Sequence, residues 1–132
     1  MGQGHYAALV WGVAGDAVDA VYVTDDDGDR DIAAWASEPI YGWGGKAYIA
    51  KHYESRTPWL GAMAACTDYV VAERKKSVAI LEYEAMPAAD VAERYKPHVS
   101  DAQKRWEEFR KHAAGHGVKL PVGKLLLVFD YD

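Results

Sequence analysis

The sequence has 132 residues, of which half are hydrophobic and 27% are charged, and its formal net charge is −5. This composition excludes an extended disordered chain, and it excludes a general nucleic-acid-binding surface, which would need an excess of basic residues. No apolar run approaches the ~18 residues of a membrane-spanning helix, and a single cysteine excludes an internal disulfide. We therefore expect one domain over residues 1–132, soluble and located in the reducing cytoplasm.

The N-terminal part is expected to form a β-hairpin followed by an acidic loop. Residues 5–13 are rich in aromatic and branched side chains, and residues 17–24 alternate apolar and polar ones, so both segments predict strands. Residues 14–16 would form the turn between them. Residues 25–31 contain five aspartates and a glycine, which are poor strand formers and should end the ladder.

The middle of the chain predicts one further strand and one ambiguous segment. Residues 32–45 combine aromatic residues and glycines, which indicates an irregular segment with aromatic anchors, whereas residues 46–53 predict a strand. Residues 59–72 fit a helix capped by Thr57, because alanine favours helices. They also fit a strand paired with residues 46–53. We favour the strand, since residues 69–71 (Tyr-Val-Val) prefer extended chain.

The C-terminal half is expected to be mainly helical. Residues 77–85 predict a strand, after which Pro87 begins a helical stretch that extends to about Tyr95. Pro97 must interrupt or kink this stretch, because proline lacks a backbone donor and clashes with the preceding turn. A longer helix then follows over about residues 98–114.

The longer helix has the clearest pattern in the sequence. Its apolar residues recur at intervals of three and four, at Val99, Ala102, Trp106, Phe109 and Ala113. This spacing places all five side chains on one helical face. The pattern therefore predicts that the helix packs on an apolar surface, most simply that of a sheet.

The last expected element is a strand over residues 124–131. Residues 125–129 are continuously apolar, which is typical of a strand covered on both faces and predicts a central position in the sheet. Together the elements predict an α+β fold. It consists of a mainly antiparallel sheet, a C-terminal helical segment packed on one face and a final central strand.

The acidic charge is concentrated in one segment. Residues 16–31 contain seven aspartates and one arginine, so the rest of the chain is close to neutral. Calcium loops arrange aspartates around a glycine, but aligning Gly28 with the EF-hand glycine places Val23 and Ala34 at the first and last ligand positions. We interpret the segment as a solvated acidic loop that selects a basic protein partner, without a bound metal.

Two other patterns resemble ligand sites only superficially. His112 and His116 are four residues apart on a helix, as in zinc sites, but the glutamate of the zinc-protease motif is missing between them. Residues 41–46 combine glycines with a lysine, as phosphate loops do, but no serine or threonine follows and a strand is expected next. We predict no metal and no cofactor.

Catalytic signals are weak. Cys66 with His52 or His98 as its base would form a nucleophilic pair, but a lone cysteine among alanines is typical of a small buried side chain. Glu82 and Glu84 alternate on one strand face, which fits the solvent side of a strand as well as a carboxylate pair. The sequence therefore favours a non-enzymatic protein.

Large aromatic residues gather in the first half of the chain. Tryptophan and tyrosine bury much area while keeping a polar tip, so they serve interfaces and ligand pockets as well as cores. Our candidates for an interface or ligand site are Trp11, Trp35, Tyr41, Trp43, Tyr48, His52, Tyr53, Trp59 and Glu82.

Two functional hypotheses follow from these candidates. The favoured one is an interaction domain that self-associates as a homodimer, because a small sheet has two edges to cover and two-fold dimers are common. The alternative is a small-ligand-binding domain or small enzyme with an aromatic-lined pocket. A closed pocket with converging polar groups would favour the second hypothesis, and a flat, exposed aromatic patch would favour the first.

Overall fold

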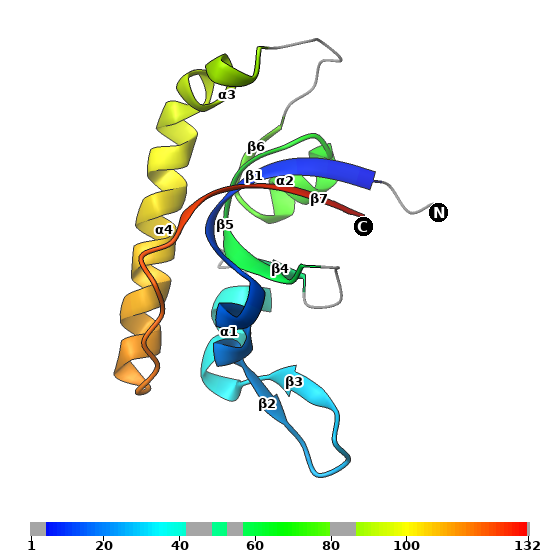
Figure 1. The fold of residues 1–132 in the computed structure, drawn as a ribbon, viewed down its shortest axis with the longest axis vertical. Helices are drawn as coiled ribbons and strands as arrows, with labels where there is room; N and C mark the ends of the chain where they lie inside the picture. Colours follow the sequence, from blue (N-terminus) through cyan, green and yellow to red (C-terminus); the bar gives the residue numbers. More distant parts are fainter. Residues whose placement is uncertain (1–4, 42–48, 53–56, 80–86, 132) are drawn as a thin grey trace.

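A coiled β-sheet with a long helix along one side dominates the fold (Figure 1). The computed structural model describes residues 5–41, 49–52, 57–79 and 87–131. The strands of the main sheet are β1 (His5–Ala14), β4 (Ala50–His52), β5 (Trp59–Cys66), β6 (Val78–Ala79) and β7 (Lys124–Tyr131). The helices are η1 (Gly15–Val21), α1 (Ala34–Tyr41), α2 (Tyr69–Arg74), α3 (Ala88–Arg94) and α4 (Lys96–Gly115). A separate ribbon consists of β2 (Tyr22–Thr24) and β3 (Arg30–Ile32).

The main sheet has the strand order β4-β5-β1-β7, and each neighbouring pair is antiparallel. The short β6 pairs with β5 in parallel, off this path. Because β1 and β4 are both antiparallel to β5, they run parallel to each other with β5 between them. In the same way, β5 and β7 run parallel with β1 between them. The sheet therefore consists of two interleaved split β-α-β units, and the expected α+β fold is confirmed.

Helix α4 covers one face of the sheet and confirms the apolar stripe. Ala102, Trp106, Phe109 and Ala113 are fully buried, and Val99 packs against the same core from the edge. The core that they enter includes Leu9 and Val13 of β1 and Leu60 of β5. The spacing of three and four residues thus fixed the buried face of this helix correctly.

The opposite face of the sheet carries a second, smaller core. It is formed by alternate residues of the same strands, including Val10 of β1 and Met63 of β5, together with Val128 of β7. Val71 and Ala72 of α2 cover part of it. The two cores explain why every residue of β5 is buried, since its side chains point alternately into both.

The position of β7 corrects one expectation. The apolar run predicted a central strand, but among the described residues β7 pairs only with β1 and lies at the end of the strand order. Val128 is buried, whereas its neighbours Leu127 and Phe129 are exposed. An apolar run shows that both faces avoid water, but it does not show whether this chain supplies the covering partners.

The predicted N-terminal hairpin is also wrong. Residues 15–21 form the 3₁₀ helix η1, and only residues 22–24 are a strand, which pairs with β3 across the acidic turn. The 3₁₀ helix has three residues per turn, which places Val18 and Val21 on one side, where both are fully buried. Burial of these two valines therefore replaces the alternation that predicted a strand.

Residues 59–72 divide between the two interpretations that the sequence allowed. The first part is the strand β5, and it pairs with β4 as expected. From Tyr69 the chain is helical, because the Asp68 carboxylate accepts a hydrogen bond from the Val71 backbone N–H at 3.0 Å and caps α2. This local cap outweighs the preference of the Tyr-Val-Val sequence for extended chain.

Three further expectations have mixed outcomes. The segment 32–45 was expected to be irregular, but its described part includes the helix α1, which tolerates Pro39 near its end. Pro97 separates two helices as expected, because α3 ends at Arg94 and Pro97 lies in the first turn of α4. The predicted strand over residues 77–85 is present as β6 in its described part.

Candidate functional site

The three described tryptophans among the predicted site residues do not share one surface. Trp11 and Trp35 pack against the core on the α4 side. Trp59 is buried in the smaller core on the opposite face. The structure therefore uses these side chains to fill its two cores and does not gather them into one aromatic pocket.

The other predicted site residues lie outside the described part of the structure. For Tyr41 and His52 only the backbone is described, and Trp43, Tyr48, Tyr53 and Glu82 fall in segments that are not described. The same holds for Glu84 of the carboxylate pair considered above. The structure gives no geometry for these candidates.

His112 of α4 and His116, which follows the last residue of α4, take part in an aromatic cluster around Trp35. The Trp35 ring lies 5.8 Å from the rings of both Phe109 and His116, measured between centroids, and 6.0 Å from that of His112. His112 Nε2 also lies 2.6 Å from the Trp35 carbonyl oxygen. Within the described segments no group of three or more His, Cys, Asp or Glu side chains is arranged to hold a metal ion. The pair therefore helps to fasten α1 to α4.

Cys66 is fully buried in the smaller core. Its Sγ accepts a hydrogen bond from the Asp68 backbone N–H at 3.4 Å. His98, one of the two bases considered for it, is exposed in the first turns of α4. This arrangement fits a small packing side chain at the junction of β5 and α2.

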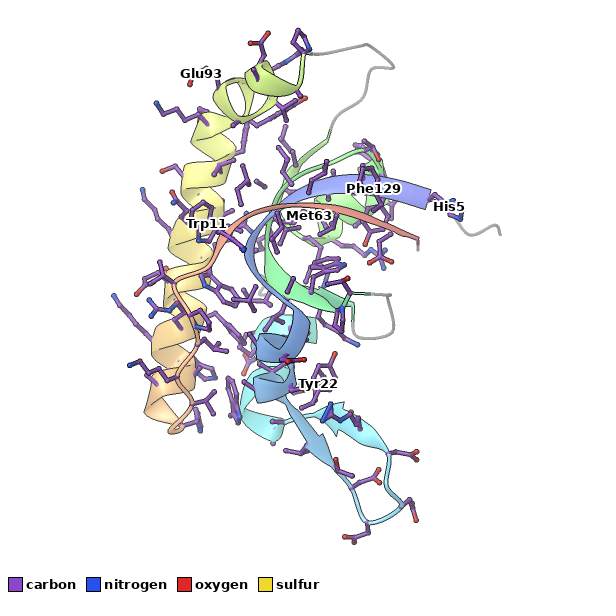
Figure 2. The ribbon with its side chains drawn as sticks, viewed as in Figure 1. His5, Trp11, Tyr22, Met63, Glu93 and Phe129 are labelled. Atoms are coloured by element: carbon purple, nitrogen blue, oxygen red, sulfur yellow. The ribbon has the colours of Figure 1, made fainter. Side chains whose placement is uncertain are left out.

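The surface that sequence reasoning missed is the outer edge of β7. Leu127 is 61% exposed and Phe129 is 74% exposed, and Val122, just before the strand, is 64% exposed. Figure 2 shows Phe129 on β7 toward the end of the sheet where His5 begins β1. The signal was present in the sequence as the apolar run 125–129, but it was assigned to a covered strand.

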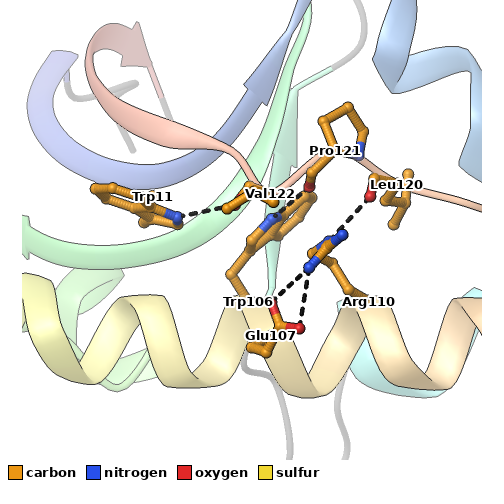
Figure 3. Close-up of polar contacts among 7 residues, drawn as sticks. All are labelled: Trp11, Trp106, Glu107, Arg110, Leu120, Pro121 and Val122. Atoms are coloured by element: carbon orange, nitrogen blue, oxygen red, sulfur yellow. Dashed lines mark hydrogen bonds and ion pairs between the residues drawn. The ribbon is translucent and has the colours of Figure 1, made fainter.

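Three side-chain donors hold the segment that leads into β7 (Figure 3). The carbonyl oxygens of residues 120–122 each accept one hydrogen bond from β1 or α4. The donors are Trp11 Nε1 to Val122 at 3.1 Å, Trp106 Nε1 to Pro121 at 3.1 Å and Arg110 Nε to Leu120 at 2.9 Å. Glu107 holds the Arg110 guanidinium at 2.7 Å. The start of β7 is therefore fixed to the body of the molecule.

Gly123 completes this attachment. Its φ of +86° lies in the region that favours glycine. A Cβ at this position would also lie 2.9 Å from the Gly12 carbonyl oxygen and 2.9 Å from Trp106 Nε1. A larger residue would push the segment away from β1 and the α4 donors.

A buried hydrogen bond holds the other end of β7. Trp59 Nε1, at the start of β5, donates to Asp130 Oδ2 at 2.9 Å. Both residues are buried, and Asp130 is the only buried charged residue in the described segments. The register places Trp59 and Asp130 near opposite ends of β1, so their contact requires the sheet to coil strongly over its smaller core.

Two recesses include residues of β7, one along the strand and one across the start of β1. One, of about 240 Å³, is lined by residues 126–129 together with Ala14, Thr57 and Trp59. The other, of about 440 Å³, lies around Phe129 and Asp130 at the end of the strand and includes Thr67. Thr67 Oγ1 already accepts a hydrogen bond from the Ala7 backbone N–H at 3.0 Å. Because four consecutive residues of β7 line the first recess, this recess is a groove that runs along the strand.

The acidic ribbon lies apart from these recesses. Figure 1 shows β2 and β3 extending from the end of the molecule opposite α3. The Asp25 carboxylate accepts hydrogen bonds from the Asp27 and Asp29 backbone N–H groups, each at 2.9 Å. Arg30 bridges to Asp19 at 2.7 Å between exposed side chains. The turn is therefore held by hydrogen bonds from its backbone N–H groups to the Asp25 carboxylate, and its remaining carboxylates are exposed to solvent.

The described helices include none that is both long enough and apolar enough to cross a membrane. Comparison with known proteins gives no match to a family model, a curated protein or a solved structure.

Proposed function

We propose that this chain is a non-enzymatic interaction domain of the cytoplasm and that it self-associates as a homodimer through the edge of β7. The observation that carries the proposal is an apolar strand edge with which no described strand pairs, with Leu127 and Phe129 exposed. Long, exposed apolar edge strands are templates for pairing with another chain. A monomer would leave both large side chains in water.

Burial of the apolar side chains at this edge would favour association. Moving a leucine or phenylalanine side chain from full exposure to full burial contributes roughly 1.5–3 kcal/mol. A two-fold interface doubles the number of such side chains, because each chain contributes its own Leu127 and Phe129. Backbone hydrogen bonds between the strands would add to this contribution.

The fixed position of β7 lowers the cost of pairing. The carbonyl groups of residues 120–122 are held by Trp11, Trp106 and Arg110 before the strand begins, and Trp59 holds its end. A strand that is already ordered loses less conformational entropy when it binds. The edge of β7 is therefore preorganised for pairing.

The acidic ribbon supports a second contact, with a basic partner. Its aspartates would repel each other if two ribbons met across a symmetry axis, so we place it outside the homodimer interface. Its projection from the body of the molecule fits this placement (Figure 1). It would steer a basic partner by long-range attraction that weakens with added salt.

Light scattering after size exclusion tests self-association. At tens of micromolar protein we expect about twice the 14.6 kDa mass of one chain. The Leu127→Lys variant should shift the mass toward that of the monomer, because it brings a charge to an exposed position of the edge. Val23→Lys is the matched control, since Val23 is 51% exposed on the ribbon. A monomer mass at every concentration would reject the proposal.

One observation supports the alternative of a small-ligand domain. The 240 Å³ recess beside Trp59 and residues 126–129 is mainly apolar and approaches the size of small ligand sites. It lies on the same edge of β7, so a ligand there and a second chain would compete. If the protein is monomeric, a Trp59→Phe variant should alter the binding of apolar fluorescent probes, and Trp35→Phe on the other face should not.

A further inference from the structure

The edge strand has a symmetric sequence that fits a second copy of itself. From residue 124 to residue 130 it reads Lys-Leu-Leu-Leu-Val-Phe-Asp, with a base at one end, an acid at the other and apolar residues between. When two antiparallel copies are centred on Leu127, Lys124 of one chain lies opposite Asp130 of the other. Leu125 then lies opposite Phe129, and Leu126 opposite Val128.

We propose that two copies of the chain pair β7 with β7 in this register, with the two-fold axis at Leu127, and join their sheets into one. The inference rests on the proposed self-association and specifies its geometry. The strand is available for it, because β1 occupies one edge along eight residue pairs and no described residue pairs with the other. Leu127 would meet its symmetry mate, and Phe129 would meet Leu125 of the other chain, on the face from which Leu127 and Phe129 now project into solvent.

Charge selects this register over its neighbours. Side chains keep their faces only if the strands slide relative to each other in steps of two residues. One such shift places Lys124 opposite Val128, and the other places Asp130 opposite Leu126. Three such two-residue steps in one direction place the two Lys124 side chains opposite each other, and three in the other direction do the same for the two Asp130 side chains. Both arrangements place like charges together, which is unfavourable. Only centring on Leu127 gives two pairs of opposite charge and the longest apolar overlap.

The surroundings of the strand fit a second chain at this place. The recess lined by residues 126–129 runs along the free edge, so a paired strand would lie over it. Asp130 already orients its carboxylate through the bond from Trp59, whereas Lys124 is exposed at the other end of the strand. The pairing would bring the partner's ammonium to the end where the carboxylate lies.

Site-directed cross-linking tests the register. In Leu127→Cys the two thiols would face each other across the axis, since directly opposite Cβ atoms are about 5 Å apart, and a short bismaleimide should join the chains. Val122→Cys is the matched control, because Val122 is 64% exposed and its mate would lie roughly 30 Å away at ~3.3 Å per residue. The native Cys66 is fully buried and does not interfere.

A mixture of two variants provides an independent arm. Leu125→Cys chains mixed with Phe129→Cys chains should cross-link to each other, whereas Leu125→Cys alone should not. Lys124→Glu should raise the dimer dissociation constant about tenfold, which corresponds to about 1.4 kcal/mol, because it converts two attractive pairs into repulsive ones. Thermal melts of each variant confirm that the chain still folds.

The outcomes separate this inference from self-association itself. A dimeric mass without cross-linking at Leu127→Cys would overturn the register and leave self-association standing. Cross-linking of Val122→Cys as readily as Leu127→Cys would also overturn the register, since it would indicate unspecific collision. A monomeric mass at every concentration would overturn both. Cross-linking at Leu127→Cys and in the mixture, with none in the controls, would support the pairing.

Discussion

The chain has two phenylalanines, and they lie in opposite environments. Phe109 of α4 is fully buried, and its ring lies 5.8 Å from that of Trp35 between centroids. Phe129 of β7 is 74% exposed on the edge of the same sheet. Both belong to clear apolar patterns, so residue type does not explain the difference.

The two phenylalanines differ in burial because the chain packs other side chains around Phe109 but not around Phe129. Around Phe109, the helix stripe meets the side chains of β1 and β5 and closes a core within one chain. Around Phe129, one edge and one face of β7 are used, and the described residues do not cover the rest. An apolar pattern that a chain does not satisfy internally indicates a surface for another molecule.

The largest expected effect is that of Phe109→Ala. Removing a large buried aromatic side chain should lower the free energy of unfolding by roughly 3–5 kcal/mol, through lost burial and the cavity that remains. Denaturant unfolding followed by circular dichroism would measure it. Glu108→Ala, at the exposed neighbouring position, should change stability by less than ~0.5 kcal/mol. Equal effects for the two variants would show that α4 is oriented differently.

The second prediction concerns the closest approach of β1 and β5. Gly12 and Gly61 are paired there, and a Cβ on Gly61 would lie 2.5 Å from the Trp11 carbonyl oxygen. Gly61→Ala should therefore cost roughly 1–3 kcal/mol by overpacking. Gly115→Ala is the control, because outside the adjacent turns of its own helix no atom lies within 4 Å of its added Cβ. It should leave stability unchanged or slightly improved by the higher helix propensity of alanine, and a reversed order would contradict the close approach.

The contrast between α4 and β7 also shows how much of the fold could be predicted from the sequence. The stripe of α4 could be predicted because a repeat of three and four residues has one geometric solution. The strand β1 was likewise clear from its aromatic and branched residues. For α4 the repeat also identifies the face that must be covered, and the chain itself provides the residues that cover it.

What could not be predicted depends on distant contacts. Residues 17–24 alternate well enough to suggest a strand, yet residues 15–21 form a 3₁₀ helix that buries Val18 and Val21. Similarly, the aromatic excess suggested a shared site, but Trp35 and Trp59 belong to different cores. The edge position of β7 depends on strand order, for which a run of apolar residues carries no information.

A third prediction concerns the charge of Lys75, which lies at the margin of the core on the α4 side. Lys75 Nζ donates to the Ile40 carbonyl oxygen at 3.3 Å. Its pKa is lowered from 10.5, first by burial and then by repulsion from Arg74 and Lys51. The folded chain therefore binds this proton less tightly than the unfolded chain. Stability should rise as pH increases from the folded-state pKa toward 10.5, and below that window the full cost of the charge is present.

Lys75→Met tests this dependence. The variant should remove the alkaline rise in the free energy of unfolding, measured by denaturant titration at several pH values. Lys104→Met, at an exposed position of α4, should keep the rise. An unchanged profile for Lys75→Met would show that the lysine is fully solvated, and the margin of the core would then be less closed than described.

The smallest effect on the folded monomer should come from Phe129→Ala. At submicromolar concentration, where a weak dimer dissociates, the free energy of unfolding should change by less than ~0.5 kcal/mol, because the side chain is already in solvent. At tens of micromolar the natural chain should gain stability from association, since a partner that binds only the folded state shifts the unfolding equilibrium. Phe129→Ala should lose most of that concentration-dependent gain. A loss above ~2 kcal/mol at submicromolar concentration would mean that Phe129 packs within its own chain, and the contrast with Phe109 would disappear.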